Sequence, residues 1–217
     1  MSAHLGNERA ARAGWQDGVV DKLAGVHVVI CGAGAVGANL CEHLARIGVG
    51  RLTVVDRDRV EARNLATQPW TRTDVGQQKA PLLAKLLARA VSVDVNGVVK
   101  DVDAHNIGAL VTDADVVVDA FDNAASRAVI KGCVGALKAG AAVVHVGLAN
   151  GFAEVVWEPR YIVPPDTGAD LCDVGLSRSM VLLAVAVAGE AIVEFVASGE
   201  RRSFTLTGRD LRISPLQ

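Results

Sequence analysis

One stretch, Val28–Gly37, limits what this chain can fold into more than any other. It reads as a short apolar strand, a turn with glycines at Gly32, Gly34 and Gly37, and the start of a helix expected over residues 35–47. Such glycines allow a tight turn, close approach of the backbone to a phosphate, and close packing of helix on strand. Unpaired N–H groups and the helix dipole then favour an anion at the helix N-terminus. The stretch therefore predicts a nucleotide-binding turn.

An acidic residue follows this turn at the spacing of a nucleotide fold. Residues 51–56 predict a second strand that ends on Asp56, which lies about 20 residues beyond Gly37, where a ribose-binding carboxylate is expected. The commonest protein with this combination is an NAD-dependent oxidoreductase. Features further along the chain favour a different nucleotide.

Composition sets the broad class. The chain has 217 residues, 51% of them hydrophobic, and a formal net charge of −2. This predicts one domain with a substantial core and argues against nucleic acid as a partner, because that needs clustered positive charge. The first residues show no apolar secretory region, and the most apolar run, residues 180–189, is interrupted by Glu190 and Glu194. We therefore expect a cytoplasmic protein that does not enter a membrane.

Strand and helix patterns alternate through the first two thirds of the chain. This order predicts an α/β fold of the Rossmann-like, doubly wound type, with a mostly parallel sheet and antiparallel strands added by the C-terminal part. We expect a single domain with an N-terminal arm (1–24), a nucleotide-binding core (25–147) and a C-terminal part (148–217). Beyond the elements already named, we expect strands over 95–99, 115–119, 142–147, 152–157, 203–207 and 211–213, and helices over 76–91, 105–110, 123–139 and 176–197.

Three polar segments follow predicted strands or open predicted helices. Each has an ordinary explanation: Asn64–Gln68 suits a turn, Lys79 near a helix start suits solvent, and Asp122 suits a helix N-cap. Together with the glycine turn, they describe a site for ATP and Mg²⁺. In this interpretation Asp56 contacts the ribose, the turn and Lys79 contact the phosphates, and Asp122 holds the metal.

The same residues carry a family resemblance. From Leu23 to Ile213 the chain resembles the ThiF/MoeB family, bacterial relatives of the ubiquitin-activating enzymes. The resemblance implies adenylation, with ATP, of the C-terminal glycine carboxylate of a small ubiquitin-like or sulfur-carrier protein, and release of pyrophosphate. The motifs that carry it are Gly32-Ala-Gly-Ala-Val-Gly37, Asp56-Arg-Asp58, Asn64-Leu-x-x-Gln68, Gly76-Gln-Gln-Lys79, Asp122-Asn-x-x-x-Arg127 and Cys172-Asp-Val-Gly175.

The resemblance also implies roles for residues of these motifs. Asn64 and Lys79 would contact the phosphates, and Asp122 would contact Mg²⁺ and the reacting phosphate. Asp58 and Gln68 belong to the same motifs and are expected in the nucleotide site. Members carry an arginine pair in the N-terminal arm that acts across a homodimer, and Arg9 and Arg12 have the spacing of that pair.

Cys172 has two possible roles, a packed core residue or a catalytic one. A lone cysteine is commonly a packed core residue, as we expect for Cys31, Cys41 and Cys133. Cys172 instead lies in a proline-containing loop before a predicted helix, and a helix N-terminus favours the thiolate. In some family members a cysteine here takes the acyl group or a sulfur atom, which makes Cys172 a candidate catalytic residue.

The chain departs from the family at one important position. The usual motif has an arginine where this chain has Thr67, and threonine supplies no charge for the phosphates. Arg63, Arg72 or the arm arginines are candidates to replace it; otherwise the protein is a weak or inactive nucleotide- or partner-binding member. The paired Cys-x-x-Cys motifs of zinc-binding members are absent, which predicts a compact member without zinc.

Overall fold

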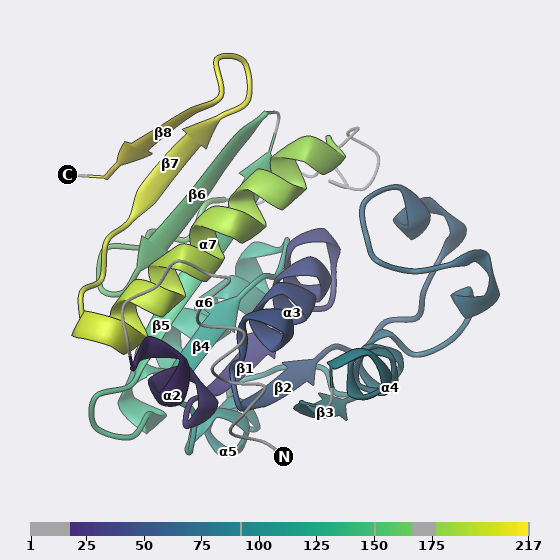
Figure 1. Ribbon diagram of the computed structural model, residues 1–217, viewed down its shortest axis with the longest axis horizontal. Coiled ribbons are helices and arrows are strands. Elements are labelled where there is room, and N and C mark those ends of the chain that lie inside the picture. The colour runs from purple at the N-terminus through teal and green to yellow at the C-terminus, as the bar shows by residue number, and fades with distance from the viewer. Residues whose placement is uncertain (1–17, 92, 150, 166–176, 217) are drawn as a thin grey trace.

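The computed structural model describes residues 18–91, 93–149, 151–165 and 177–216. Its centre is one eight-stranded sheet with the order β3-β2-β1-β4-β5-β6-β7-β8 (Figure 1). Strands β3 to β5 in this order pair in parallel, and β6, β7 and β8 are added antiparallel. This confirms the predicted fold class. The strands are β1 (His27–Cys31), β2 (Arg51–Val55), β3 (Asp94–Val98), β4 (Val116–Asp119), β5 (Ala142–Ala149), β6 (Phe152–Trp157), β7 (Phe204–Thr207) and β8 (Arg212–Pro215).

Helices cover both faces of the parallel half. Alternate residues of the central strands point to two separate cores, as the pleat requires. One core lies under α3, α4 and α7, and the other lies under α5 and α6. The helices are α2 (Val19–Ala24), α3 (Ala35–Ile47), α4 (Lys79–Val91), α5 (Ile107–Val111), α6 (Ala124–Gly132) and α7 (Arg178–Ser198), with 3-10 turns at Ala62–Ala66, Arg72–Asp74 and Cys133–Ala136.

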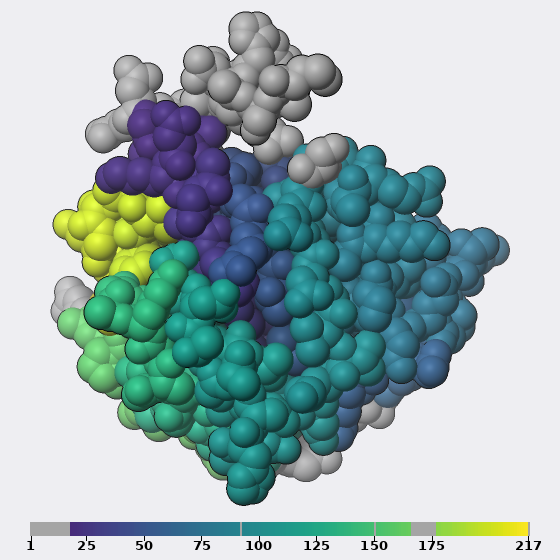
Figure 2. Space-filling view, turned by 90° about the horizontal axis from the view of Figure 1, so that it is seen from below, coloured from purple at the N-terminus to yellow at the C-terminus, as the bar shows by residue number. Residues whose placement is uncertain are grey.

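The helix α7 lies over the sheet and runs roughly along β6 (Figure 1). It has 21 residues and would qualify as a membrane span by length and composition alone, a test that core helices also pass. Here its buried side packs on α3 and on the strands β5 and β6. Its last turn accepts a hydrogen bond from α2, where Lys22 Nζ lies 2.7 Å from the oxygen of Ala197. The space-filling view shows α2, in purple, against the yellow C-terminal part of the chain (Figure 2).

Two predicted helix boundaries were wrong. The helix expected over 123–139 ends at Gly132 and continues only as a 3-10 turn, because glycines at 132 and 135 weaken helix formation. The helix expected from residue 76 begins at Lys79, since Gly76 adopts a left-handed φ of 89° and belongs to the preceding turn.

Candidate functional site

A cavity of about 450 Å³ lies at the carboxyl ends of the parallel strands. Ligands of open α/β sheets bind at this edge. The glycine turn, the loop after β2, the start of α4 and the loop after β4 all contribute to its wall. Among its lining residues are Gly32, Gly34, Asp56, Asp58, Asn64, Gln68, Lys79 and Asp122, so residues far apart in the sequence meet at one site.

The three glycines of the turn have distinct environments. Gly32 has a φ of 101° and its N–H donates to the oxygen of Val55 at 2.8 Å, which closes the turn against β2. A Cβ on Gly37 would lie 1.9 Å from the carbonyl oxygen of Gly32, so no side chain fits there. Gly34 is the N-cap of α3 and makes no side-chain cap, and the space beside it is open. The helix start is therefore available to an anion.

Asp56 is a buried carboxylate that holds the turn from the β2 side. One of its oxygens accepts from the N–H of Ala33 and the other from the N–H of Asp58, each at 2.6 Å. Burial raises the pKa of Asp56, and the two backbone hydrogen bonds partly oppose this effect. Its contact with a ribose stays a prediction, but its structural role in shaping the turn is clear.

The loop after β2 is stabilised by its own polar side chains. Asn64 Oδ1 accepts from the N–H of Glu61 at 2.9 Å in a capping box. Gln68 Oε1 accepts from the indole of Trp70 at 2.7 Å. Asn39 of α3 donates to the oxygen of Thr67 at 2.8 Å and ties the loop to the glycine helix. Asn64 and Gln68 thus have structural roles. The phosphate contact of Asn64 and the place of Gln68 in a nucleotide site remain predictions.

Lys79 is the first residue of α4, and its side chain is only 8% exposed. Its Nζ lies 3.6 Å from Asp58 Oδ2 on the cavity wall. This carboxylate is the local reason for a buried lysine at an otherwise unfavourable end of the helix.

Asp122 is not the helix cap that its position suggested. The cap of α6 is Asn123, whose side chain accepts from the N–H of Ser126 at 2.9 Å. Asp122 is exposed on the cavity wall, which leaves its carboxylate available to a ligand. The ordinary explanation of this acid is therefore wrong.

The structure separates the arginines proposed to replace the missing charge at Thr67. Arg63 lines the cavity together with Thr67, whereas Arg72 does not. Arg9 and Arg12 lie outside the described residues, as does Cys172. The sequence reading missed two further cations on the wall, Arg57 and Lys100. Their positions just after β2 and β3, at the carboxyl edge, were the available signal.

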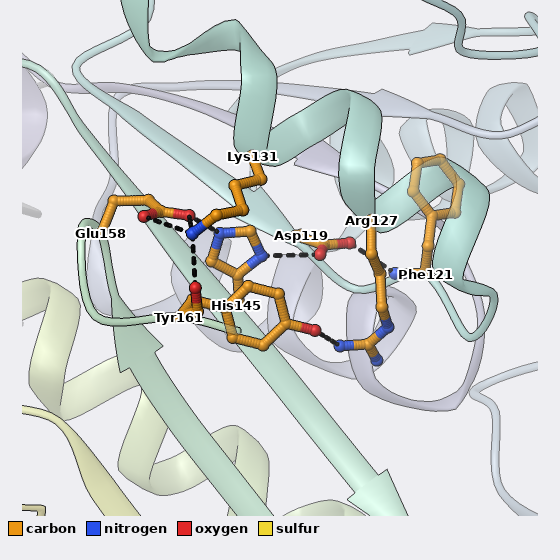
Figure 3. Close-up of polar contacts among 7 residues, drawn as sticks. All are labelled: Asp119, Phe121, Arg127, Lys131, His145, Glu158 and Tyr161. Carbon is orange, nitrogen blue, oxygen red and sulfur yellow. Dashed lines mark hydrogen bonds and ion pairs between the residues drawn. The ribbon is translucent and has the colours of Figure 1, made fainter. Parts of the chain in front are cut away.

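A buried polar network, also missed from the sequence, lies beside the cavity (Figure 3). His145 of β5 faces two carboxylates, with Nδ1 2.7 Å from Asp119 Oδ2 and Nε2 2.9 Å from Glu158 Oε1. The ring of Tyr161 stacks on His145 at 3.7 Å between centroids, and its hydroxyl accepts from Arg127 at 2.6 Å. Arg127 also lines the cavity, so the network reaches the site.

The described cysteines behave as core residues, as expected. Cys31, Cys41 and Cys133 are buried free thiols. Burial raises the pKa of Cys41 to about 12 and that of Cys133 to about 11. Within the described residues no group of three His, Cys, Asp or Glu side chains is placed to hold a metal ion.

Comparison with known proteins assigns the family. Residues 7–194 match the model of the ThiF family. The chain belongs to the ThiF family. This confirms the resemblance found in the motifs of the glycine turn, the loop after β2 and the start of α6.

Curated relatives of this ThiF-family chain are named as adenylyltransferases or as an activating enzyme. It is 42% identical over 113 residues to the sulfur carrier protein ThiS adenylyltransferase of Bacillus subtilis, covering 50% of this chain and 34% of that protein. It is 42% identical over 109 residues to the SAMP-activating enzyme E1 of Haloferax volcanii, covering 49% and 40%. The molybdopterin-synthase adenylyltransferase of Escherichia coli is 33% identical over 150 residues, covering 65% and 59%. The matches thus span between a third and three fifths of these relatives.

Solved structures share the fold at low identity. A crystal structure of E. coli MccB with ATP has a TM-score of 0.73 at 22% identity, covering 92% of this chain and 65% of that one. The crystal structure of PaaA has a TM-score of 0.75 at 17% identity, covering 92% and 66%. These likenesses support the fold assignment.

Proposed function

We propose that this chain is an ATP-dependent adenylyltransferase that activates the C-terminal glycine carboxylate of a small sulfur-carrier or ubiquitin-like protein. The observation that carries the proposal is the convergence of the glycine turn, Lys79, Asn64 and Asp122 on one cavity. The names of its curated relatives point to the same reaction class. None of the relatives named above is an oxidoreductase, so the dinucleotide alternative loses its support.

The cavity suits a reaction that brings anions together. The carrier carboxylate attacks the α-phosphate of ATP, and the bond to the departing pyrophosphate breaks. The start of α3 offers backbone donors, and Lys79 offers a fixed positive charge at the cavity wall. Such groups accelerate phosphoryl chemistry by holding the reactants in line and by offsetting negative charge.

The donor set fits Mg²⁺ as the accompanying cation. Mg²⁺ is commonly held by one or two carboxylates, with waters and substrate phosphates completing its shell. Asp122 provides one exposed carboxylate on the cavity wall, freed from helix capping by Asn123. When bound there, Mg²⁺ would offset phosphate charge. The proposed reaction uses no zinc.

The partner and the assembly belong to the same proposal. The carrier would end in Gly-Gly, because an extended tail without side chains can approach Asp122 along the sheet. The protein would act in the cytoplasm as a homodimer, with Arg9 and Arg12 reaching the partner's nucleotide site and Cys172 as the candidate acceptor of the activated group. Sulfur transfer in cofactor or natural-product biosynthesis is the proposed pathway class.

The test is ATP–pyrophosphate exchange with purified carrier. We expect exchange that requires a carrier ending in Gly-Gly and that disappears in Asp122→Ala. Absence of exchange with every Gly-Gly-ended carrier encoded beside this protein would contradict the proposal.

Thr67 supports a second candidate, a nucleotide- or partner-binding protein with little turnover. Thr67 lines the cavity where the family motif has an arginine. Calorimetry with ATP, followed by an assay for the adenylate, separates the two. Binding without adenylate formation supports this candidate, and rapid adenylate formation excludes it.

A further inference from the structure

The ionisable side chains that contact His145 on its two ring nitrogens are buried. His145 and Asp119 are fully buried and Glu158 is 8% exposed. A neutral imidazole has a single N–H, yet both ring nitrogens face a carboxylate oxygen. Each ring nitrogen therefore shares one proton with the carboxyl group that it faces. Lys131 Nζ also donates to both oxygens of Glu158, at 3.2 and 3.3 Å.

One member of this network is shared with the cavity wall. Asp119 Oδ2 accepts from Nδ1 of His145, and its Oδ1 accepts from the N–H of Phe121 at 3.1 Å. Phe121 and the following Asp122 both line the cavity. The hydrogen bond to His145 therefore fixes the carboxylate that in turn holds the N–H of Phe121 (Figure 3). Asp122 is the next residue along this corner.

The other side of the ring reaches a different segment. Glu158 directly follows β6, and Cys172 comes later in the same segment of the sequence. Lys131 of α6 ties this segment down a second time by donating to the backbone oxygen of Tyr161. The two sides of the imidazole thus join the corner after β4 to the segment after β6.

We propose that His145 is a positioning residue, which holds the Phe121–Asp122 corner in place through Asp119. Its hydrogen bond to Glu158 fixes the segment after β6 and does not position the corner. The expected effect on catalysis rests on the proposed function. The anchoring of Phe121 is a property of the folded chain and can be measured without substrate.

Two substitutions separate the sides of the ring. The amide of asparagine ends near the position of Nδ1, and that of glutamine reaches the position of Nε2. His145→Asn can therefore keep the hydrogen bond to Asp119, and His145→Gln can keep the one to Glu158. Both lose the stacking with Tyr161, so this loss is common to the two variants. Lys131→Met removes the contacts to Glu158 and to the backbone oxygen of Tyr161 but none of Asp119, and is the control.

The experiment measures three quantities in each variant: hydrogen exchange of the Phe121 amide, the melting temperature, and kcat and KM for carrier-dependent ATP–pyrophosphate exchange. We expect a faster-exchanging Phe121 amide and a kcat lower by about tenfold to a hundredfold in His145→Gln, with KM for ATP within about twofold. His145→Asn and Lys131→Met should keep amide protection and stay within about threefold of wild-type kcat. In the wild type, nitrogen NMR should show a proton on Nδ1 of His145, because this N–H is the donor to Asp119.

The outcomes are distinct. Equal Phe121 protection in the two His145 variants, a kcat that only follows the melting temperature, or a ring without a proton on Nδ1 would overturn the inference. A wild type without carrier-dependent exchange, but with Phe121 protection lost only in His145→Gln, would sink the proposed function and leave the positioning of the corner standing.

Discussion

The carboxylate of Asp56 accepts a hydrogen bond of 2.6 Å from the backbone nitrogen of Ala33, in the middle of the glycine turn. Its other oxygen accepts from the N–H of Asp58 at the same distance. The acid just after β2 therefore shapes the glycine turn without any ligand. A residue expected from the sequence to read a ribose has a structural role in the same site.

Asp56→Asn should weaken both the fold and nucleotide binding. An amide keeps one acceptor and turns its NH₂ towards a backbone N–H, which leaves a buried donor unsatisfied. We expect a loss of about 1–3 kcal/mol in the free energy of unfolding. Urea denaturation measures this loss, and calorimetry with ATP should show weaker binding. An unchanged unfolding free energy would contradict the role in shaping the turn.

Arg63 should be the arginine of the long loop that compensates for Thr67. It lines the cavity and Arg72 does not, although both belong to the same exposed loop. Arg63→Ala should weaken ATP binding about tenfold, as expected for loss of a hydrogen bond to a charged group. Arg72→Ala is the matched control and should bind as the wild type does. Equal losses of ATP affinity in the two variants, measured by calorimetry, would mean that binding depends on the net charge of the loop and not on the position of Arg63.

Asp122 and Asn123 are neighbours with separable tasks. Asp122→Asn should remove ATP–pyrophosphate exchange and leave the melting temperature within error, since Asp122 caps no helix. Asn123→Ala should cost about 1 kcal/mol of stability, because it removes the N-cap of α6. Thermal denaturation and exchange assays on both variants test this division. A large melting shift in Asp122→Asn would show that the acid has a structural role after all.

His43 makes stability depend on pH. Its Nε2 is buried without a hydrogen-bond partner in the described structure, and it packs where Gly189 of α7 leaves room. Burial lowers the pKa of His43 from 6.5, and Glu190 partly opposes this. As pH falls below 6.5 the unfolded ring takes a proton before the folded one does, so the free energy of unfolding falls.

His43→Gln should therefore flatten stability between pH 7 and about pH 5. A residual slope is expected from His27, whose pKa is also lowered, chiefly by burial. Urea denaturation at a series of pH values provides the measurement. The same slope in the variant and the wild type would exclude His43 as a source.

The order of elements could be predicted because each is a local pattern. The alternation of apolar strands with amphipathic helices fixes the parallel half, and the acid after β2 marks the ligand edge. Cap identity could not be predicted, because Asp122 and Asn123 are both good caps and only the backbone geometry decides between them. In the same way, only the folded loop distinguishes Arg63 from Arg72.

The His145 network was out of reach for a different reason. Asp119 and His145 become neighbours through the parallel register of β4 and β5, where the two residues are paired. Glu158 joins them from the segment after β6. The signal that was present is compositional: a histidine inside the apolar strand β5 and an acid that ends β4, both on the face covered by α6. Polar residues in buried strands need partners, and these two supply them for each other.

The last prediction concerns Gly37 and Gly34, which the sequence motif treats alike. A Cβ at Gly37 would lie 1.9 Å from the oxygen of Gly32, so Gly37→Ala must push α3 away from the turn and should cost about 3 kcal/mol or more. A Cβ at Gly34 meets nothing within 4 Å, and its φ of −80° suits alanine. Gly34→Ala should fold as the wild type does but bind ATP more weakly, because the added methyl occupies space at the start of α3 that the phosphates need. Thermal denaturation separates the first effect and calorimetry the second. Tight ATP binding by Gly34→Ala would place the phosphates away from the glycine turn.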